Sequence, residues 1–176
     1  MEDVILVDIN DEPLGLMEKM EAHQKGLLHR AFSVFIFNTK GELLLQQRAM
    51  QKYHSAGLWT NTCCSHPRYD ETVIEAGERR LREEMGFSTP LQKIFDFIYH
   101  APFENGLIEH EFDHVLVGYY DETITPCNDE VHHYRFEAMD AIQQELMAHP
   151  AQYTAWFQIA YPKVYAWWQR QPVFIV

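Results

Sequence analysis

The segment TVIEAGERRLREEM at residues 72–85 narrows the possible folds more than any other part of the sequence. Its residues favour a helix, and Gly86 directly after it is well placed to end that helix. Apolar runs rich in β-forming residues lie before it, at 31–37, and after it, at 111–120. A helix between strands, followed by further helices, predicts a mixed α+β sandwich with sheet and helix layers.

Other segments complete this pattern. Three more strands are expected, at 4–10, 42–47 and 94–99. Helical patterns return at 138–148 and 151–170, where we expect Pro162 to kink or divide the helix. The chain shows no repeat, low-complexity tract or Gly/Ser linker, so we expect one continuous domain over residues 1–176.

The charge balance excludes some classes of function. The chain has 14 Lys and Arg against 26 Asp and Glu, which gives a net charge of −12. Nucleic-acid binders and proteins that dock on anionic membranes need the opposite sign. We therefore expect neither partner, and any bound anion requires a few local cations or a metal.

The cysteines and the terminal segments bear on location. Cys63, Cys64 and Cys127 are an odd number with two adjacent members, which does not form a disulfide framework. The acidic start MEDVILVDINDE lacks the features of a secretory signal. Residues 146–162 carry no formal charge but contain His, Gln and Pro, which favours a buried or amphipathic helix over a membrane span. We expect reduced thiols and a cytoplasmic protein.

The run IEHEFDH places acidic residues on alternate positions. In a strand, Glu109, Glu111 and Asp113 share one face. Two carboxylates about 7 Å apart repel each other unless a cation lies between them or they reach water. The alternative is a solvated edge strand.

The segment WTNTCCSHP contains a thiol close to an imidazole, because Cys64 precedes His66 by two residues. A thiol near a cation or metal ionises more easily and can act as acid or base. The alternative is a pair of small buried thiols. His23 and His29, taken singly, are equally compatible with structural or surface roles.

Charges crowd the helix at 72–85. Arg80 and Glu84 are spaced i,i+4 and should pair. These charges either form a salt-bridged, solvent-exposed helix face or belong to a binding site. In the second case a carboxylate holds a divalent metal and an Arg beside it contacts phosphate. The basic residues Lys19, Arg48 and Lys52 are candidates for further anion contacts.

The stretch from Ser65 to Phe87 resembles the Nudix box, G-x5-E-x7-R-E-U-x-E-E-x-G-U with U apolar. The matching residues are Glu71, Arg79, Leu81, Glu83, Glu84, Gly86 and Phe87. Ser65 stands where the box begins with Gly, and Arg80 where its first paired Glu belongs. These departures argue against an ordinary Nudix pyrophosphate hydrolase.

Five segments in the same order resemble the type 1 isopentenyl-diphosphate isomerases, a branch of the Nudix superfamily, over about residues 4 to 160. They are EKMEAH, LLHRAF, LLLQQRAMQKYHSAGLWTNTCCSHP, RRLREEMG and IEHEFDHVLVG. The resemblance implies a Nudix-like α/β/α sandwich with a mixed sheet, an additional N-terminal strand segment and C-terminal helices. It also implies metal-dependent conversion of isopentenyl to dimethylallyl diphosphate, in isoprenoid biosynthesis, by a protein that we expect to be a monomer.

The resemblance also implies a set of site residues. The ligands of one Mn²⁺ or Zn²⁺ would be His23, His29, His66, Glu109 and Glu111, and Glu84 would hold Mg²⁺. The diphosphate contacts would be Lys19, Arg48, Lys52 and Arg80. The catalytic residues would be Cys64, Glu111, Tyr99 and Trp156. Where the family usually has glycine, this chain has Ser65 and Asp70, both near the catalytic loop.

The implied reaction requires an acid, a base and an active-site lining without a nucleophile that would react with the carbocation. We expect Glu111 as the acid, Cys64 as a thiolate base and Tyr99 supporting Glu111. The Trp156 ring would face the cation, and the aromatic C-terminal segment would exclude water as a lid. For Trp167 and Trp168 we prefer core packing. The alternatives are a hydrolase of nucleotide diphosphates, disfavoured by Arg80, and a metal-binding protein without catalysis, which does not explain Cys64.

Overall fold

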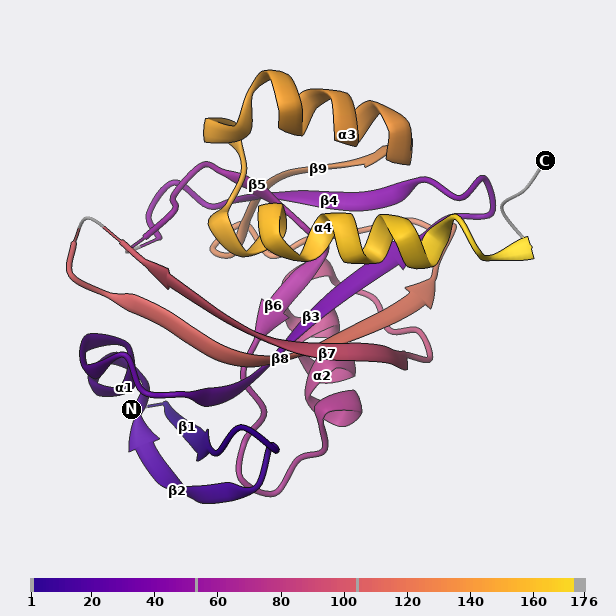
Figure 1. The fold of residues 1–176 in the computed structure, drawn as a ribbon. Coiled ribbons are helices and arrows are strands. Elements are labelled where there is room, and N and C mark those ends of the chain that lie inside the picture. Colours follow the sequence, from indigo (N-terminus) through magenta and orange to yellow (C-terminus); the bar gives the residue numbers. More distant parts are fainter. Residues whose placement is uncertain (1, 53, 104, 173–176) are drawn as a thin grey trace.

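Strand β3, His29–Phe37, runs through the middle of the fold and is buried on both faces (Figure 1). Its side chains alternate between two apolar cores. Phe35 and Phe37 pack with residues of helices α3 and α4, whereas Val34 and Ile36 pack with residues of helix α2. A strand covered on both faces is apolar at almost every position, which explains the uninterrupted run AFSVFIF.

The computed structural model describes residues 2–52, 54–103 and 105–172. The other strands there are β1 (Asp3–Val7), β2 (Pro13–Glu18), β4 (Leu43–Arg48), β5 (Trp59–Thr60), β6 (Cys63–Ser65), β7 (Gln92–Pro102), β8 (Ile108–Tyr119) and β9 (Val131–Glu137). The helices are α1 (Lys19–Lys25), α2 (Val73–Met85), α3 (Met139–Ala148) and α4 (Ala155–Trp168), with a 3₁₀ turn η1 (Pro150–Gln152).

The sheet is mixed. Its main path is β2-β1-β3-β4-β5, and β8 lies parallel to β3 while pairing antiparallel with β7. Helix α2 covers one face, and α3 and α4 lie on the other (Figure 1). The expected α/β/α arrangement, with the N-terminal strands β1 and β2 and the C-terminal helices, is confirmed.

Helix α2 ends before Gly86 as predicted and begins one residue later than predicted, because Thr72 is its N-cap. The Thr72 hydroxyl accepts from the Glu75 amide, and the Glu75 carboxylate accepts from the Thr72 amide, which forms a capping box. Gly86 ends the helix with a φ of 77°, and a Cβ there would lie 2.1 Å from the Thr125 carbonyl oxygen. Only glycine fits this helix end without a rearrangement.

The sequence patterns missed the short strands β5 and β6, and they also missed β2, α1 and β9. Strand β2 is an exposed edge strand, α1 has only seven residues, and β9 carries polar side chains on most positions. None of the three has a strong apolar period. Pro162 does not divide α4; it is exposed, so the carbonyl that loses its partner lies on the water side of the helix. The helix begins at Ala155 because Thr154 caps it.

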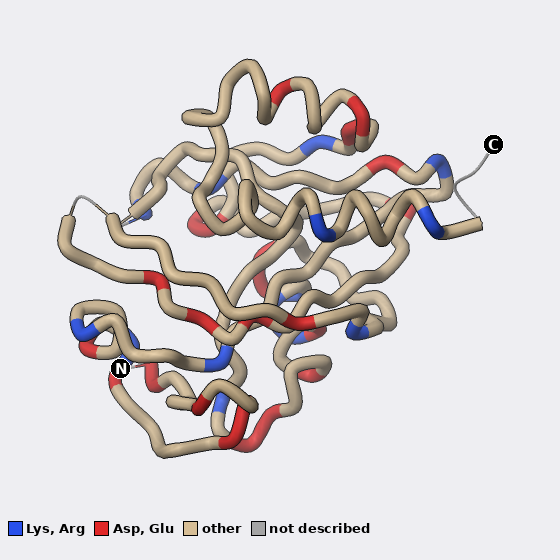
Figure 2. The backbone as a smooth tube through the Cα atoms, in the orientation of Figure 1, with Lys and Arg blue, Asp and Glu red and all other residues tan. Residues whose placement is uncertain are grey.

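The described parts of the chain contain no helix long and apolar enough to cross a bilayer. Lys and Arg are dispersed among the more numerous acidic residues along the backbone (Figure 2). An anion site in this protein therefore has to be built from a few local cations.

Candidate active site

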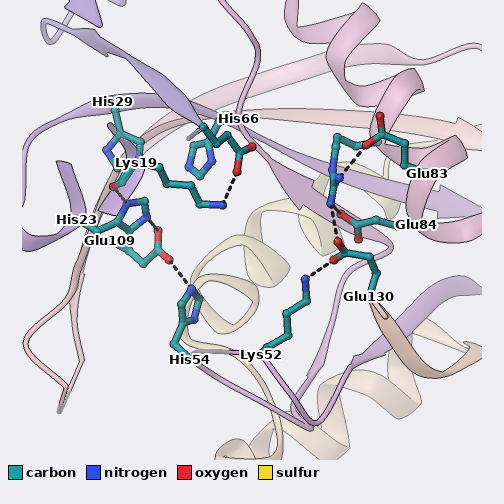
Figure 3. Close-up of polar contacts among 12 residues, drawn as sticks. Lys19, His23, His29, Lys52, His54, His66, Glu83, Glu84, Glu109 and Glu130 are labelled. Carbon is teal, nitrogen blue, oxygen red and sulfur yellow. Dashed lines mark hydrogen bonds and ion pairs between the residues drawn. The ribbon is translucent and has the colours of Figure 1, made fainter. Parts of the chain in front are cut away.

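Three histidines from distant segments lie close together (Figure 3), and Glu111 lies beside them. His23 comes from α1, His29 from the start of β3 and His66 from the loop after β6. The ring centroids of His23 and His29 are 4.7 Å apart, and those of His29 and His66 are 5.0 Å apart. One possible ligand atom from each of these four residues lies within 4.8 Å of all the others, and all four residues are buried.

The imidazoles are held by main-chain carbonyls. His23 Nδ1 lies 2.7 Å from the Lys19 oxygen, and His29 Nδ1 lies 2.8 Å from the Leu27 oxygen. A carbonyl only accepts, so in each ring Nδ1 carries a hydrogen and Nε2 is the nitrogen that faces the cluster. In the described structure His29 Nε2 and His66 Nδ1 have no hydrogen-bond partner. Buried imidazoles clustered beside a carboxylate are a donor set that fits a transition metal.

Glu111 lies at the centre of this cluster. Tyr99, its antiparallel neighbour on β7, donates a hydrogen bond of 2.6 Å to one carboxylate oxygen. The other oxygen is 2.9 Å from His66 Nε2 and 3.6 Å from His29 Nε2. Burial acts to raise the pKa of Glu111, but the two imidazoles outweigh it and hold that pKa well below its ordinary value.

Glu109 shares a face of β8 with Glu111 but lies outside the group of four. Its carboxylate oxygens are 3.4 Å from His23 Nε2 and 3.6 Å from His54 Nε2. Burial and the charge of Glu111 raise the pKa of Glu109 to about 7. Strand β8 is flanked by β3 and β7, so the alternative of a solvated edge strand is wrong.

The adjacent cysteines face opposite ways along β6. Cys63 is fully buried in the core under α2, whereas Cys64 lines the cavity described below. Burial, with the negative charge of Asp113, raises the pKa of the Cys64 thiol. At neutral pH these shifts favour a thiol at Cys64 and a carboxylate at Glu111, the reverse of the protonation states expected from the sequence.

A second charged cluster lies where α2 approaches β4. Arg80 contacts Glu84 at 2.5 Å, which confirms the i,i+4 pair, and it also lies 3.5 Å from Glu130. Gln46 donates to the second Glu84 oxygen at 2.9 Å, and Lys52 pairs with Glu130 (Figure 3). The pairing holds the cationic groups in place along the cavity wall.

All of the expected site residues except His29 line one cavity of about 260 Å³. His23 and His66 lie toward one end of this cavity, and Glu84 and Glu130 lie toward the other (Figure 3). The Arg48 guanidinium carbon lies 5.2 Å from the centre of the Trp156 ring, which forms part of the cavity wall. Lys19 also lines the cavity and pairs with Glu2 at 3.0 Å.

Several residues of the cavity were not anticipated from the sequence. They are Glu2, Ser33, Gln46, His54, Thr60 and Glu130. Gln46, His54 and Thr60 lie in the segment from 43 to 67 that resembles the isomerase family, but no local signal distinguishes them from their neighbours. Glu2, Ser33 and Glu130 lie outside the motifs named above. Trp167 and Trp168, the last residues of α4, pack against the core, as expected from the sequence.

The fold and the box together define a class of protein. Residues 27–157 match the model of the NUDIX domain. A crystal structure of a Deinococcus radiodurans protein superposes with a TM-score of 0.78 at 18% identity, covering 93% of this chain and 99% of that one. A MutT protein from Methanosarcina mazei superposes with a TM-score of 0.66 at 19% identity, covering 82% and 96% of the two chains. The chain thus has the Nudix fold.

Curated relatives narrow the class. The chain is 51% identical over 167 residues to an isopentenyl-diphosphate Delta-isomerase of Pectobacterium atrosepticum, covering 95% of this chain and 93% of that protein. It is 51% identical over 156 residues to one of Burkholderia multivorans, with 89% of each covered. The chain belongs to the isopentenyl-diphosphate Delta-isomerase family of Nudix proteins.

Proposed function

We propose that this protein is an isopentenyl-diphosphate Delta-isomerase, which moves the double bond of isopentenyl diphosphate to give dimethylallyl diphosphate. The observation that carries the proposal is a single cavity with a thiol, Cys64, and a carboxylate, Glu111, on its walls and a cationic cluster at one end. This combination suits a small diphosphate whose hydrocarbon tail exchanges protons. The relatives named above support the same reaction.

The diphosphate would bind at the cationic end. Lys19, Arg48, Lys52 and Arg80 all line the cavity. Arg80 offers a planar fork that matches phosphate oxygens, and Lys52 offers a point charge. Buried Glu84 would hold Mg²⁺, which would supply positive charge to the diphosphate when bound. This arrangement anchors the substrate by its charged end and leaves the tail beside Cys64 and Glu111.

The second metal would be held by His23, His29, His66, Glu109 and Glu111. The ligand atoms of His23, His29, His66 and Glu111 already lie within 4.8 Å of one another. Mn²⁺ or Zn²⁺ suits nitrogen and carboxylate donors, and when bound it would offset the negative charge of the two glutamates. Tyr99 holds one oxygen of Glu111 by its hydrogen bond, so the carboxylate keeps a fixed direction toward the cavity.

Proton transfer would use Cys64 and Glu111 as the acid–base pair. One adds a proton to the alkene and the other removes a proton from the neighbouring methylene, through a tertiary carbocation. The Trp156 ring would stabilise that cation by its π face, worth about 2 kcal/mol when desolvated. Of the described C-terminal aromatic residues only Trp156 lines the cavity, so its ring would be the part of that segment that keeps water from the cation.

Location and assembly follow from the same site. The cavity is built by one chain, so catalysis would need no second copy, and we propose a monomer. A reaction that depends on the free thiol of Cys64 suits a reducing compartment, which favours the cytoplasm.

The test is incubation of the protein with isopentenyl diphosphate, Mg²⁺ and Mn²⁺ or Zn²⁺ in deuterated water. We expect dimethylallyl diphosphate that carries deuterium, detected by mass spectrometry. Release of phosphate or isopentenyl monophosphate without isomerisation would instead identify a hydrolase. Metal binding without any turnover would leave only a binding protein.

A further inference from the structure

Asn61 lies in the turn between β5 and β6, is fully buried and contacts the Cys64 thiol. Its amide nitrogen donates to the carbonyl oxygens of Val34, at 3.1 Å, and Cys63, at 2.9 Å. Carbonyl oxygens only accept, so the nitrogen of the amide has to be on this side. The amide oxygen is thereby directed to the opposite side.

That oxygen accepts two hydrogen bonds. The Cys64 thiol donates to it at 3.1 Å, and the Thr60 hydroxyl donates to it at 2.9 Å. All four hydrogen-bonding positions of the Asn61 side chain are therefore used. A buried polar group that is fully satisfied has one preferred orientation, because any rotation breaks several bonds at once.

The chain of hydrogen bonds continues to helix α4. The Thr60 oxygen accepts from the Thr154 hydroxyl at 3.0 Å, and both side chains are buried. Thr154 is the N-cap of α4, and its oxygen also accepts from the Phe157 amide. Its own amide donates to the Trp59 carbonyl at 3.0 Å, so the start of α4 is fastened to the turn that carries Asn61.

Two groups of the proposed reaction lie at the ends of this network. Cys64 is at one end, and Trp156, in the first turn of α4, is at the other. We propose that Asn61 and Thr60 are positioning residues that hold the Cys64 thiol in a fixed place relative to Trp156. The inference rests on the proposed function, which gives both groups their roles. A displacement of about 1 Å at a reacting group can cost a hundredfold in rate.

The first experiment compares two threonines of the same segment. Thr60→Val keeps the shape of the side chain but removes the link between Asn61 and Thr154. We expect kcat to fall about tenfold with KM changed less than about twofold. Thr60→Ser keeps the hydroxyl and should restore most of the turnover.

Thr62 provides the matched control. It is also fully buried, and its hydroxyl bonds the main chain of Leu44 and Ile36 rather than Asn61. Thr62→Val should lower the melting temperature and leave kcat unchanged. Equal losses of turnover in Thr60→Val and Thr62→Val, or full turnover in Thr60→Val, would overturn the proposal.

The second experiment needs no substrate. The infrared S–H stretching band of Cys64, assigned by its absence in Cys64→Ala, should move to higher frequency in Asn61→Ala, because the thiol loses its nearer acceptor and keeps only the Ser33 hydroxyl at 3.6 Å. The band should not move in Thr62→Val. An unmoved band in folded Asn61→Ala would overturn the positioning role, even in an active isomerase. A moved band in a protein without isomerase activity would leave the hydrogen bond established and reject the proposed function instead.

Discussion

At the scale of single residues, the two adjacent cysteines differ by the face of β6 on which they lie. Cys63 is enclosed by the core under α2, and Cys64 reaches the cavity. Cys64→Ala should lower turnover by about three orders of magnitude or more with little change in melting temperature, because it removes a proton-transfer group. Cys63→Ala should mainly lower stability. Turnover and melting temperature of both variants check this, and a larger loss of turnover in Cys63→Ala would contradict the register.

Trp156 tests whether ring electronics matter in addition to size. Its ring lines the cavity and is nearly buried, at 5% exposure. Trp156→Phe keeps a weaker π face, so we expect about tenfold lower turnover. Trp156→Leu keeps apolar bulk without a π face and should lose much more turnover than substrate affinity. Steady-state kinetics of the two variants check this prediction. Equal turnover in both would show that Trp156 contributes by packing and not by its π face.

At the scale of elements, Glu130 joins three of them. Lying just before β9, it pairs with Lys52 after β4 and with Arg80 on α2. Burial acts to raise the pKa of Glu130, but these cations outweigh it and lower that pKa below its ordinary value of 4.5. A lowered carboxyl pKa stabilises the folded state above the unfolded pKa, and this contribution is lost as the pH falls.

Glu130→Gln should therefore lower the free energy of unfolding by about 1 kcal/mol at pH 7. The difference from the wild type should shrink below pH 4.5, as the carboxyl of the wild type takes up its proton. Urea unfolding at pH 7 and pH 4 measures both values. Exposed Glu122→Gln is the control and should show no such pH dependence. A Glu130→Gln difference that stays constant with pH would contradict the ion-pair account.

At the scale of the whole molecule, the histidine cluster joins α1, β3 and the loop after β6. We expect about one transition metal per chain in the purified protein. His66→Ala and Glu109→Ala should each weaken metal binding about 10- to 100-fold, because each removes a ligand or a group that orients one. Added metal should raise the melting temperature of the wild type more than that of either variant. Exposed His132→Ala is the control and should keep its metal. Full metal occupancy in both ligand variants would contradict the assignment of these residues as a metal site.

The sequence by itself determined what depends on neighbours a few residues apart. Helix α2 and its end at Gly86 followed from the local residue pattern, and the Arg80–Glu84 pair followed from helical spacing. The shared face of Glu109 and Glu111 followed from strand alternation. These features need only local backbone geometry, which short patterns specify. The family resemblance added the site as a set of residues, without their contacts.

The tertiary structure decided what depends on strand pairing. The parallel register of β3 and β8 sets His29 beside Glu111, and the antiparallel register of β7 and β8 sets Tyr99 beside the same residue. The counter-ion Glu130 and the protonation of the Cys64 thiol depend in the same way on groups far along the chain. Such contacts are fixed by burial of whole strand faces rather than by any local signal, because a slip of one residue would turn every side chain to the opposite face.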